Sequence, residues 1–243
     1  MTAGQLAGKR VVVVGGTSGM GLGAARAAAS AGAEVIAAGR RPAAERPAVE
    51  VGVLRHAVVD ATDESSVVAL FDEIGELDHL LVTAAPSGPG GDFLDHDVAA
   101  ARRYIDGKFM ASWACARYAA PRMRAGGSIA FLTGAASVRP RPGLAIVSAA
   151  FAAVEALARA LAIDLGPLRV NVIRPGLVDS DMWRFLPDDA REQLFDKARQ
   201  SFPVRRVGSI DDIGHAAVFL MTNPYVTGAV LEVTGGEQLV DGI

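Results

Sequence analysis

The sequence predicts a doubly wound α/β fold, a mostly parallel, seven-stranded sheet with helices on both faces. Short apolar, β-branched runs alternate along the chain with longer alanine-rich segments, which is the strand–helix alternation of parallel sheets. The short runs are continuously apolar, which indicates strands buried on both faces. Right-handed crossovers would then place ligands at the carboxyl ends of the strands.

The expected elements follow one another in a regular order. The first strand is the valine run 11–14, which ends in glycines, and the alanine-rich segment 20–31 is a helix closed by Gly32. Further apolar runs predict strands at 34–38, 54–59, 80–84, 128–133, 169–173 and 229–233. Helices are expected between most of them, at 63–74, 97–124, 147–165 and 210–222.

Residues 1–243 are expected to form one domain. No repeat and no linker rich in proline, glycine and serine divides the chain, and the short proline-rich stretch 139–143 is interpreted as a loop. The segment at about 176–205 is rich in Asp, Arg, Trp and Phe. We expect it to form a loop with short helices that covers the ligand site as a lid.

Composition argues against several classes of function. A net charge of −3 and a pI near 5.8 do not favour nucleic-acid or anionic-membrane partners. No apolar run of membrane-spanning length is free of charges or breakers, so no membrane span is expected. The first ten residues lack the apolar core of a secretion signal, and the single Cys115 suits a reducing compartment, so a cytoplasmic location is expected. The four histidines are interpreted as scattered over loops and outer helices, and no metal site is expected.

A glycine-rich turn is the first candidate site. The segment Gly15-Gly-Thr-Ser-Gly19-Met-Gly21 follows a strand and opens a helix. Gly15 permits the tight turn, Gly19 lets the backbone approach a pyrophosphate, and Gly21 permits close helix–strand packing. Free N–H groups and the helix dipole favour phosphate there. The turn therefore predicts a dinucleotide site with contacts from Gly15, Thr17, Ser18, Gly19, Met20 and Gly21.

The end of the second strand favours NADP(H) over NAD(H). A carboxylate is expected about twenty residues after the turn where the adenosine ribose carries a free 2′-hydroxyl. The strand instead ends in Gly39 followed by Arg40 and Arg41, and arginine can pair with a 2′-phosphate. The alternative is that both arginines are solvated and set no preference. Asp60, with Ala61 beside it, ends the third strand and is expected to receive the adenine amine.

Along nearly its whole length the sequence resembles the short-chain dehydrogenase/reductase family. The matching pieces are the GGTSGMG turn, the Asp60 turn, Thr83-Ala-Ala85 in place of the family's Asn-Asn-Ala-Gly, 169–176 (RVNVIRPG) and 233–236 (VTGG). The resemblance implies a Rossmann-like fold. It also implies further cofactor contacts from Ala84, Ala85, Pro175, Gly176, Val178 and Ser180, with Ser180 standing where the family has a Thr near the nicotinamide amide.

The same resemblance shows that the family's catalytic residues are replaced. The family uses a Tyr and a Lys four residues apart on one helix, a Ser after the preceding strand and an Asn on the long helix. In this sequence Val147 stands at the Tyr position, Phe151 at the Lys position, Gly134 at the Ser position and Lys108 at the Asn position. Val147 and Phe151 lie one helical turn apart, so a face that is polar in the family is expected to be apolar here.

Three residues are candidates for the missing chemistry. Lys108 could supply, from the long helix, the positive charge lost at position 151. Burying a lysine without a partner is costly, so Lys108 is expected to pair with the ribose hydroxyls, the pyrophosphate side or a substrate anion. The alternative is that Lys108 faces solvent or a subunit boundary. Tyr104 lies four residues before Lys108 and could imitate the lost pair, or it is a packing residue. Ser148 could orient a substrate oxygen.

Three functions remain open at this stage. The first is an NADP-dependent reductase or dehydrogenase that acts on a hydrophobic small molecule with non-standard proton delivery. The second is a non-redox enzyme, such as an isomerase, dehydratase or cyclase, and the third is a catalytically silent NADP(H) sensor. The resemblance implies a homodimer or homotetramer, because family members usually pair the helix from Val147 with its mate. This helix offers a close-packing face rich in Ala and Leu, with Ala152, Ala153, Ala156, Leu157, Ala160 and Leu161. The alternative is that this face packs on the sheet.

Overall fold

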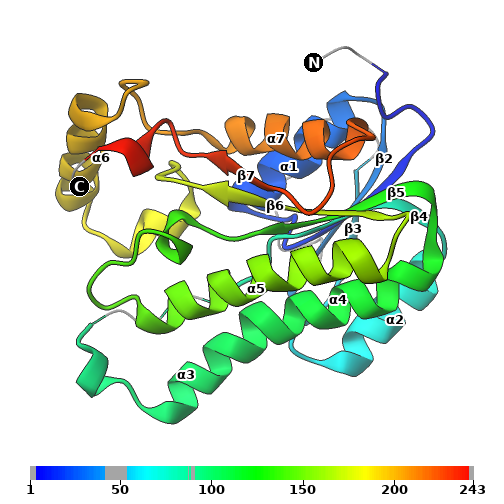
Figure 1. Ribbon diagram of the computed structural model, residues 1–243, viewed down its shortest axis with the longest axis horizontal. Coiled ribbons are helices and arrows are strands. Elements are labelled where there is room, and N and C mark those ends of the chain that lie inside the picture. The colour runs from blue at the N-terminus through cyan, green and yellow to red at the C-terminus, as the bar shows by residue number, and fades with distance from the viewer. Residues whose placement is uncertain (1–3, 42–53, 87, 89–90, 241–243) are drawn as a thin grey trace.

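All strands in the described part of the chain lie in one parallel sheet. The computed structural model describes residues 4–41, 54–86, 88 and 91–240. The sheet has the order β3-β2-β1-β4-β5-β6-β7, and every neighbouring pair is parallel (Figure 1). The strands are β1 (Arg10–Val14), β2 (Glu34–Gly39), β3 (Leu54–Val58), β4 (Leu77–Val82), β5 (Met123–Leu132), β6 (Arg169–Pro175) and β7 (Val230–Val233). The order reverses between β1 and β4, which confirms the doubly wound, Rossmann-like fold.

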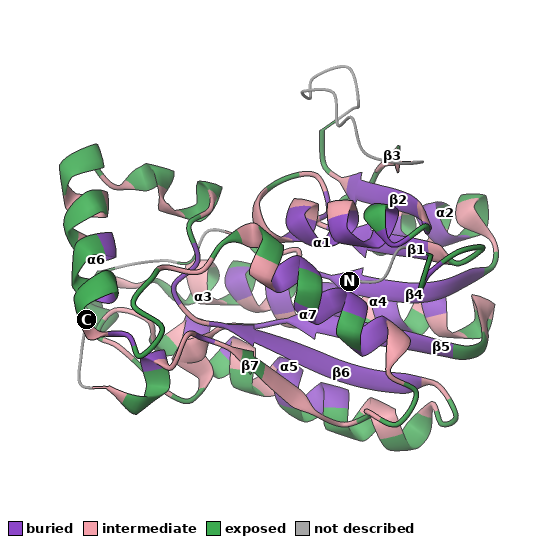
Figure 2. Cartoon of the chain, turned by 90° about the horizontal axis from the view of Figure 1, so that it is seen from above, coloured by how far each residue is buried: buried purple, intermediate pink, exposed green. Residues whose placement is uncertain are grey.

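Helices cover both faces of this sheet. On one face lie α1 (Gly19–Ser30) and α7 (Ile210–Thr222), and on the other α2 (Glu64–Ile74), α3 (Val98–Ile105), α4 (Ala111–Ala119) and α5 (Ala145–Asp164) (Figure 1). The alternation of side chains along β1 explains why both layers are needed. Val11 and Val13 pack on the α1–α7 side, whereas Val12 and Val14 pack on the opposite side. Figure 2 shows the central strands buried between these layers.

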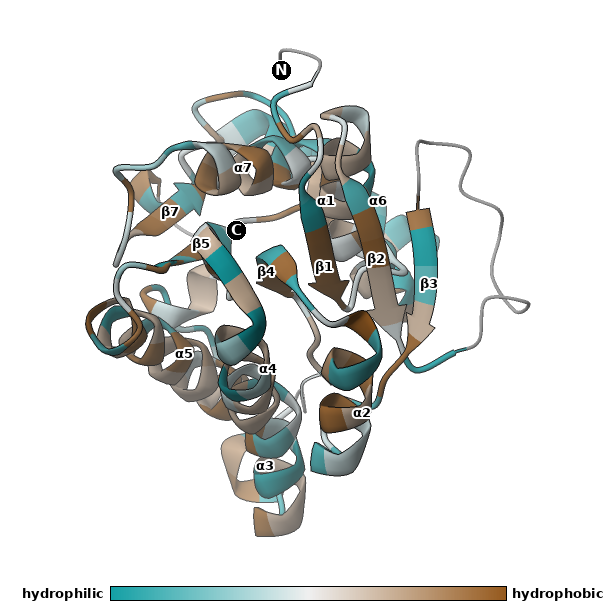
Figure 3. Ribbon diagram, turned by 90° about the vertical axis from the view of Figure 1, so that its right-hand side faces the viewer, coloured by the Kyte–Doolittle hydropathy of each residue, from teal (hydrophilic) through white to brown (hydrophobic). Residues whose placement is uncertain are grey.

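The central and edge strands of the sheet differ in polarity because they are buried to different extents. β1 is formed almost entirely by buried valines, whereas β3, at the edge, is half-buried and carries Arg55 and His56 (Figure 3). Two glycines bring the backbones of α1 and α7 into contact on the covered face. A Cβ at Gly23 would lie 2.2 Å from the carbonyl oxygen of Ile210, and one at Gly214 would lie 2.7 Å from the carbonyl oxygen of Gly23. This contact fixes the position of α1, whose first turn is the predicted phosphate site.

The predicted helix 97–124 is wrong in two respects. It is interrupted by a π-helical segment, η3 (Asp106–Met110), between α3 and α4. It also ends early, because the short 3₁₀ turn η4 (Ala120–Arg122) leads directly into β5 at Met123. The pairing of β4 with β5 shifts register between Leu77 and His79, so residues 124–127 bulge. The strand β5 begins at Met123, five residues before the predicted strand 128–133.

The predicted strand 80–84 also lies two to three residues too late, because β4 spans Leu77–Val82. The first residues of β4 include Asp78 and His79. These residue types are typical of loops, but both side chains are buried. Asp78 forms ion pairs with Lys9 and Arg124, and His79 Nδ1 hydrogen-bonds Ser128 Oγ at 2.9 Å. Paired in this way, polar residues can occupy a central strand.

The segment predicted as a lid at 176–205 contains a 3₁₀ turn, η6 (Asp181–Phe185), and one 14-residue helix, α6 (Asp188–Ser201), rather than only short helices. Helix α6 lies beyond one end of the sheet and is mostly exposed (Figures 1 and 2). Phe195, Ala198 and Phe202 anchor it to Leu177, which directly follows the β6 turn. The other short turns are η2 (Phe93–Asp95), η5 (Ala135–Ser137) and η7 (Glu237–Leu239). Whether the segment covers a ligand stays a prediction.

Candidate cofactor and active site

The glycine turn after β1 packs directly on the loop after β4. Gly15 has φ +87°, and a Cβ there would lie 2.4 Å from Thr83 Oγ1 and 2.8 Å from the backbone nitrogen of Ala84. A Cβ at Gly21 would lie 2.2 Å from the carbonyl oxygen of Gly15. Any side chain at these two positions would therefore force the turn away from the sheet, which agrees with the roles predicted for both glycines.

The N-terminus of α1 fits a phosphate group. Gly19 has φ +49°, and the nearest heavy atom to a Cβ there would be Ser180 Cβ at 3.9 Å, so the space in front of its backbone is open. The N-cap Ser18 forms no side-chain cap and no acidic residue lies in the first turn. The first N–H groups of the helix are thus left for another acceptor. The Ser180 hydroxyl is buried without a hydrogen-bond partner among the described residues. An anion bound at this turn would accept hydrogen bonds from the free N–H groups of α1 and from the Ser180 hydroxyl.

Arg40, Arg41 and Asp60 are the residues predicted to contact the adenosine half of a dinucleotide, and this role stays a prediction. Arg40 and Arg41 are exposed directly after β2. Asp60 follows the edge strand β3 and accepts hydrogen bonds from Thr62 N at 3.0 Å and Thr62 Oγ1 at 2.7 Å. These two bonds, with a smaller contribution from Arg40, lower the pKa of Asp60. Arg40 and Asp60 therefore border one region next to the half-buried Ala61.

Gly134, Val147 and Phe151, which are predicted to stand at the family's catalytic positions, form one apolar wall. Val147 is buried with Tyr104 and Ala150, and Phe151 packs on them; we refer to these four residues as the apolar cluster. A Cβ at Gly134 would lie 2.7 Å from Phe151 Cε2, so the phenyl ring occupies the place that a side chain at position 134 would take. Gly134 has an ordinary extended backbone, with φ −176°. A glycine at 134 is therefore explained by the space that the Phe151 ring takes, and not by a backbone conformation that only glycine adopts.

Lys108 is buried beside this wall. It lies in the π-helical segment η3 and is 1% exposed. Its Nζ donates to the carbonyl oxygen of Ala84 at 3.3 Å and lies 5.7 Å from the centroid of the Phe151 ring. No carboxylate of the described residues pairs with it, and burial lowers the pKa of Lys108 to about 8. The solvent-facing alternative for Lys108 is wrong.

Tyr104 and Ser148 lie near the apolar cluster with different prospects. Burial raises the pKa of Tyr104 to about 12, so its phenol stays neutral. Its ring packs on Val147, and a Cβ at Gly88 would lie 3.5 Å from it. The Ser148 hydroxyl is buried without a partner among the described residues, as expected of a group kept for a ligand.

Two buried carboxylates near the site were not found from the sequence. The first, Glu155, lies one helical turn beyond Phe151 on α5 and binds Arg174 through two hydrogen bonds of 3.0 and 2.7 Å. It also accepts from Thr133 Oγ1 at 3.1 Å and Ser137 Oγ at 2.6 Å, the residues on either side of Gly134. Burial favours the neutral acid, but these donors outweigh it and lower the pKa of Glu155. Glu155 is the one charged residue in segment 145–158, and this feature of the sequence could have identified it as a candidate.

The second carboxylate, Glu237, ties together three segments that border the same end of the sheet. It accepts from the backbone nitrogen of Leu177 at 2.8 Å and pairs with Arg141, while Arg139 donates to its carbonyl oxygen. A Cβ at Gly176 would lie 2.5 Å from Glu237 Oε2, so the predicted contact residue Gly176 is needed for this approach. The buried Pro175 at the end of β6 precedes this turn. The turn after β6 and the loop before α5 are thereby held in place by one carboxylate.

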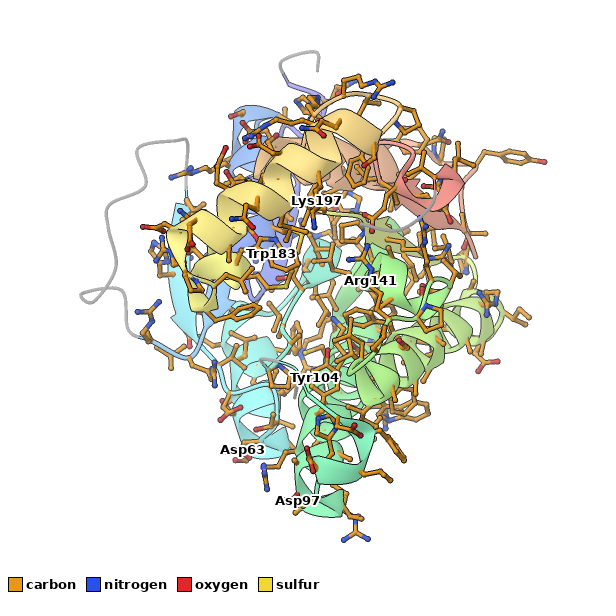
Figure 4. The ribbon with its side chains drawn as sticks, turned by 90° about the vertical axis from the view of Figure 1, so that its left-hand side faces the viewer. Asp63, Asp97, Tyr104, Arg141, Trp183 and Lys197 are labelled. Carbon is orange, nitrogen blue, oxygen red and sulfur yellow. The ribbon has the colours of Figure 1, made fainter. Side chains whose placement is uncertain are left out.

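Aromatic residues of η6 lie over this same end. Trp183 Nε1 donates to the carbonyl oxygen of Val178 at 2.8 Å, and its ring stands 6.3 Å from that of Phe185. Phe185 is 73% exposed. Figure 4 shows Trp183, Arg141 and Tyr104 on one side of the molecule, from η6, the loop before α5 and helix α3. Of the other predicted contact residues, Ala85, after β4, is exposed, and Thr17 and Met20 of the glycine-rich turn are half-buried.

The expectation that all histidines lie on loops or outer helices is wrong. His79 is buried within β4, where burial lowers its pKa to about 4, and His56 lies in β3. Within the described parts of the chain no three His, Cys, Asp or Glu residues come together in a way that could hold a metal ion.

Comparisons with known proteins place these features in context. Residues 14–238 match the family described as enoyl-(acyl carrier protein) reductase. The chain is 32% identical to the short-chain dehydrogenase/reductase ucsE of an Acremonium species, over 98% of both chains. A crystal structure of a small-chain dehydrogenase in complex with NADPH is 32% identical and superposes with a TM-score of 0.82, over 95% of this chain and 99% of that one. The reductase/Diels–Alderase MalC of Malbranchea aurantiaca is 27% identical, with a TM-score of 0.88 over 97% of this chain and 98% of that one.

Proposed function

Because the chain belongs to the short-chain dehydrogenase/reductase family, we propose that it binds NADP(H) and transfers hydride between this cofactor and a carbonyl or alcohol group of a hydrophobic substrate. Proton delivery in this reaction does not use the tyrosine and lysine of the family, since Val147 and Phe151 stand in their place. Members of the family share oxidoreductase chemistry. The substrate and the proton donor are the features that we propose to be specific to this chain.

One observation carries the cofactor proposal. The Ser180 hydroxyl is buried without a partner and lies next to Gly19, at a helix N-terminus that has neither a side-chain cap nor an acid. A diphosphate fits all three features, because it accepts hydrogen bonds from the hydroxyl and from the free N–H groups and is attracted by the helix dipole. The NADPH complex of a protein that is 32% identical supports the same assignment.

Arg40 and Arg41 support NADPH over NADH, and fluorescence titration tests this preference. We expect Arg40→Ser with Arg41→Ser to weaken NADPH binding by about 10- to 100-fold, because charge-assisted hydrogen bonds contribute about 1.5–3 kcal/mol, while NADH binding stays unchanged. Arg103→Ser, an exposed arginine on α3, is the matched control. Equal affinity of the unmodified protein for NADPH and NADH would contradict the preference, and no binding of either would overturn the cofactor proposal.

The apolar cluster supports a hydrophobic substrate. Phe151 and Val147 replace groups that would contact polar oxygens, and Met182 and Phe185 of η6 are 54% and 73% exposed near the same end of the sheet. Bound NADPH would supply the hydride. The chain's own residues bind and orient the substrate against the apolar cluster and exclude water there. Loss of a general acid typically costs about 10²–10⁴-fold in rate, so hydride transfer without the family's tyrosine is feasible.

Oxidation of NADPH with a panel of apolar ketones, aldehydes and quinones tests the reaction. We expect turnover with aromatic or polycyclic carbonyls and much weaker turnover with sugars. NADPH binding without oxidation across the panel would contradict hydride transfer but leave the cofactor site intact.

A non-redox enzyme is the second candidate, favoured by the apolar wall at the family's catalytic positions and by the likeness to MalC, which is described as both a reductase and a Diels–Alderase. The two candidates differ in one measurement. A non-redox enzyme would convert its substrate without changing the NADPH absorbance, so product analysis by mass spectrometry beside the absorbance trace separates them.

A further inference from the structure

Lys108 is a buried cation whose hydrogen bonds are mostly unused. An ammonium group has three N–H donors, and the structure gives Lys108 one acceptor, the carbonyl oxygen of Ala84 at 3.3 Å. The Phe151 ring, 5.7 Å away, offers its face on another side. Charged groups with 1% exposure are rare unless they are paired, and burying one without a partner costs several kcal/mol. The fold therefore retains this charge at a cost in stability.

Among the residues that the structure describes, no neighbouring element supplies a compensating charge. Lys108 is surrounded by helices α3, α4 and α5 and by the loop after β4. The residues of this loop from Thr83 to Pro86 are not titratable, and α5 presents Val147 and Phe151. Helix α3 contributes Tyr104, which is neutral over the whole working pH range. On α4, Ser112 donates to the Lys108 carbonyl oxygen and not to its ammonium.

The backbone is shaped to place this side chain. The π-helical turn at 106–110 widens the helix where Lys108 lies, and Gly107 lets the ring of Pro86 approach, because a Cβ there would lie 2.8 Å from Pro86 Cδ. Such π-helical turns are frequent at functional sites. The loop after β4 thus packs on the turn that carries the lysine, and its Ala84 carbonyl orients the ammonium toward the carboxyl edge of the sheet.

We propose that Lys108 forms an anion site in the apolar wall, where its ammonium holds and protonates the oxygen of the substrate's carbonyl group as that oxygen becomes negative. The inference rests on the proposed function and names its proton donor. During reduction, a C–H bond forms at the carbonyl carbon as hydride arrives from NADPH, and the C=O π pair moves to oxygen. The oxygen takes a proton from Lys108 Nζ, the carbonyl becomes an alcohol, the cofactor is oxidised, and the lysine regains its proton from water.

The pKa of Lys108, about 8, suits this role. An ammonium group with that pKa is mostly charged at neutral pH, yet it releases a proton more readily than an exposed lysine. It would also bind any stable anion whose body is apolar. An apolar carboxylate is therefore a probe for the site that does not depend on turnover.

The experiment is calorimetric titration of the protein, with and without saturating NADP⁺, with naphthoate and with the neutral naphthamide of the same shape. We expect naphthoate to bind more tightly than naphthamide by about 10- to 100-fold, the range of a charge-assisted hydrogen bond. Lys108→Met should abolish this preference by weakening naphthoate binding, and it should weaken naphthamide binding much less. Lys197→Met, an exposed lysine on α6, serves as the matched control and should behave like the unmodified protein.

A pH series adds a readout that a structural role of Lys108 would not produce. Naphthoate affinity should be constant below about pH 7 and fall as pH rises through about 8, because the amine loses its charge there. Naphthamide affinity should not change. Equal affinity for the two compounds, or a preference that survives Lys108→Met, would overturn the anion site.

The outcome is distinguishable from failure of the proposed function. If NADPH binds but naphthoate shows no preference, the lysine assignment fails and the cofactor proposal stands. If neither NADPH nor NADP⁺ binds, the titration of the free protein still decides whether Lys108 holds an anion.

Discussion

Lys108 illustrates at the scale of one residue how function can oppose stability. A methionine would fill nearly the same volume without a charge, and it would suit a helix that packs on Val147 and Phe151. A lysine that is fully buried and has no carboxylate partner among the described residues is therefore a poor choice for stability alone. Its presence is better explained by a ligand that carries the missing negative charge.

We predict that Lys108→Met stabilises the protein in a pH-dependent way. The folded-state pKa, about 8, lies below the ordinary value of 10.5, so between these pH values the unfolded chain binds a proton that the folded chain has lost. The free energy of unfolding of the unmodified protein should therefore rise across this interval. The variant lacks this rise and should be more stable by about 3 kcal/mol at pH 7, with the gap closing by about pH 10.5.

Urea unfolding of both proteins at a series of pH values measures this gap. Because Tyr104 and Cys115, whose pKa values burial raises to about 12, titrate in both proteins, the difference between the two curves isolates the lysine. A gap that stays constant with pH, or a less stable variant, would show that the ammonium is not buried unpaired.

The sequence predicted some features of individual residues and could not predict others. The roles of the glycines in the turn after β1 follow from their spacing, because the local backbone conformation depends on neighbouring residues. The replacement predicted at 134, 147 and 151 follows from the resemblance to the family and stays a prediction. The complementarity of Gly134 and Phe151 does not, since seventeen residues and a helix start separate them. Nor does the pairing of Glu155 with Arg174, which requires knowing that α5 lies on β6.

At the scale of elements, α5 and the loop after β5 form a matched pair. The Phe151 ring fills the space beside Gly134, and Glu155 binds Thr133 and Ser137 on either side of that glycine. The residues at 134 and 151 therefore depend on each other, because a side chain at 134 and the phenyl ring at 151 compete for the same volume.

A double-mutant cycle tests this coupling. Gly134→Ser alone should destabilise the protein by about 1–3 kcal/mol through overpacking, whereas in the Phe151→Lys background it should cost much less. Ala135→Ser, at a neighbouring half-buried position, is the control. Thermal unfolding of the four proteins gives the coupling energy. Additive effects of the two substitutions would contradict the pairing and would mean that the loop can move away from the ring.

Element bounds were predicted less well than element order, for a physical reason. Periodicity identified every strand of the sheet, because buried strands must be apolar. It placed β4 too late because paired polar residues, Asp78 and His79, look like a turn, and it missed the π-helical segment because helical spacing does not distinguish α from π turns. Such features depend on partners far along the chain.

At the scale of the whole molecule, α5 has an apolar face that the sheet does not cover. It is the one helix, among those in the described residues, that is long and apolar enough to span a membrane by length and composition alone, with a mean hydropathy of 1.9. A core helix of a folded domain passes the same test, and α5 packs on β5 and β6 with Glu155 bound to Arg174. Only 33% of the apolar 18-residue stretch of α5 is buried, however. The cytoplasmic location stays a prediction.

A second copy of the chain is the occupant that we propose for this face. Its exposed residues include Ala149, Ala152, Ala156 and Ala160, which allow close helix approach, and next to it lies a groove of about 430 Å³ between α4 and α5. The groove is lined mainly by apolar side chains, among them Trp113, which is 47% exposed, and Leu161 and Leu165. Apolar patches of this kind mark subunit contacts, and an isologous pairing of α5 with its mate would cover both copies at once.

We therefore predict a homodimer or homotetramer that Ala156→Arg dissociates. An arginine at the centre of a close helix contact must either push the helices apart or be buried without a partner, and both weaken association by several kcal/mol. Light scattering after size-exclusion chromatography should give a multiple of 25.1 kDa for the unmodified protein and 25.1 kDa for the variant. Ser30→Arg, at the exposed end of α1 on the other face of the sheet, should remain assembled. Because the α5 face is remote from Gly19 and Ser180, the dissociated variant should still bind NADPH, whereas an unmodified protein that is monomeric at high concentration would contradict the pairing.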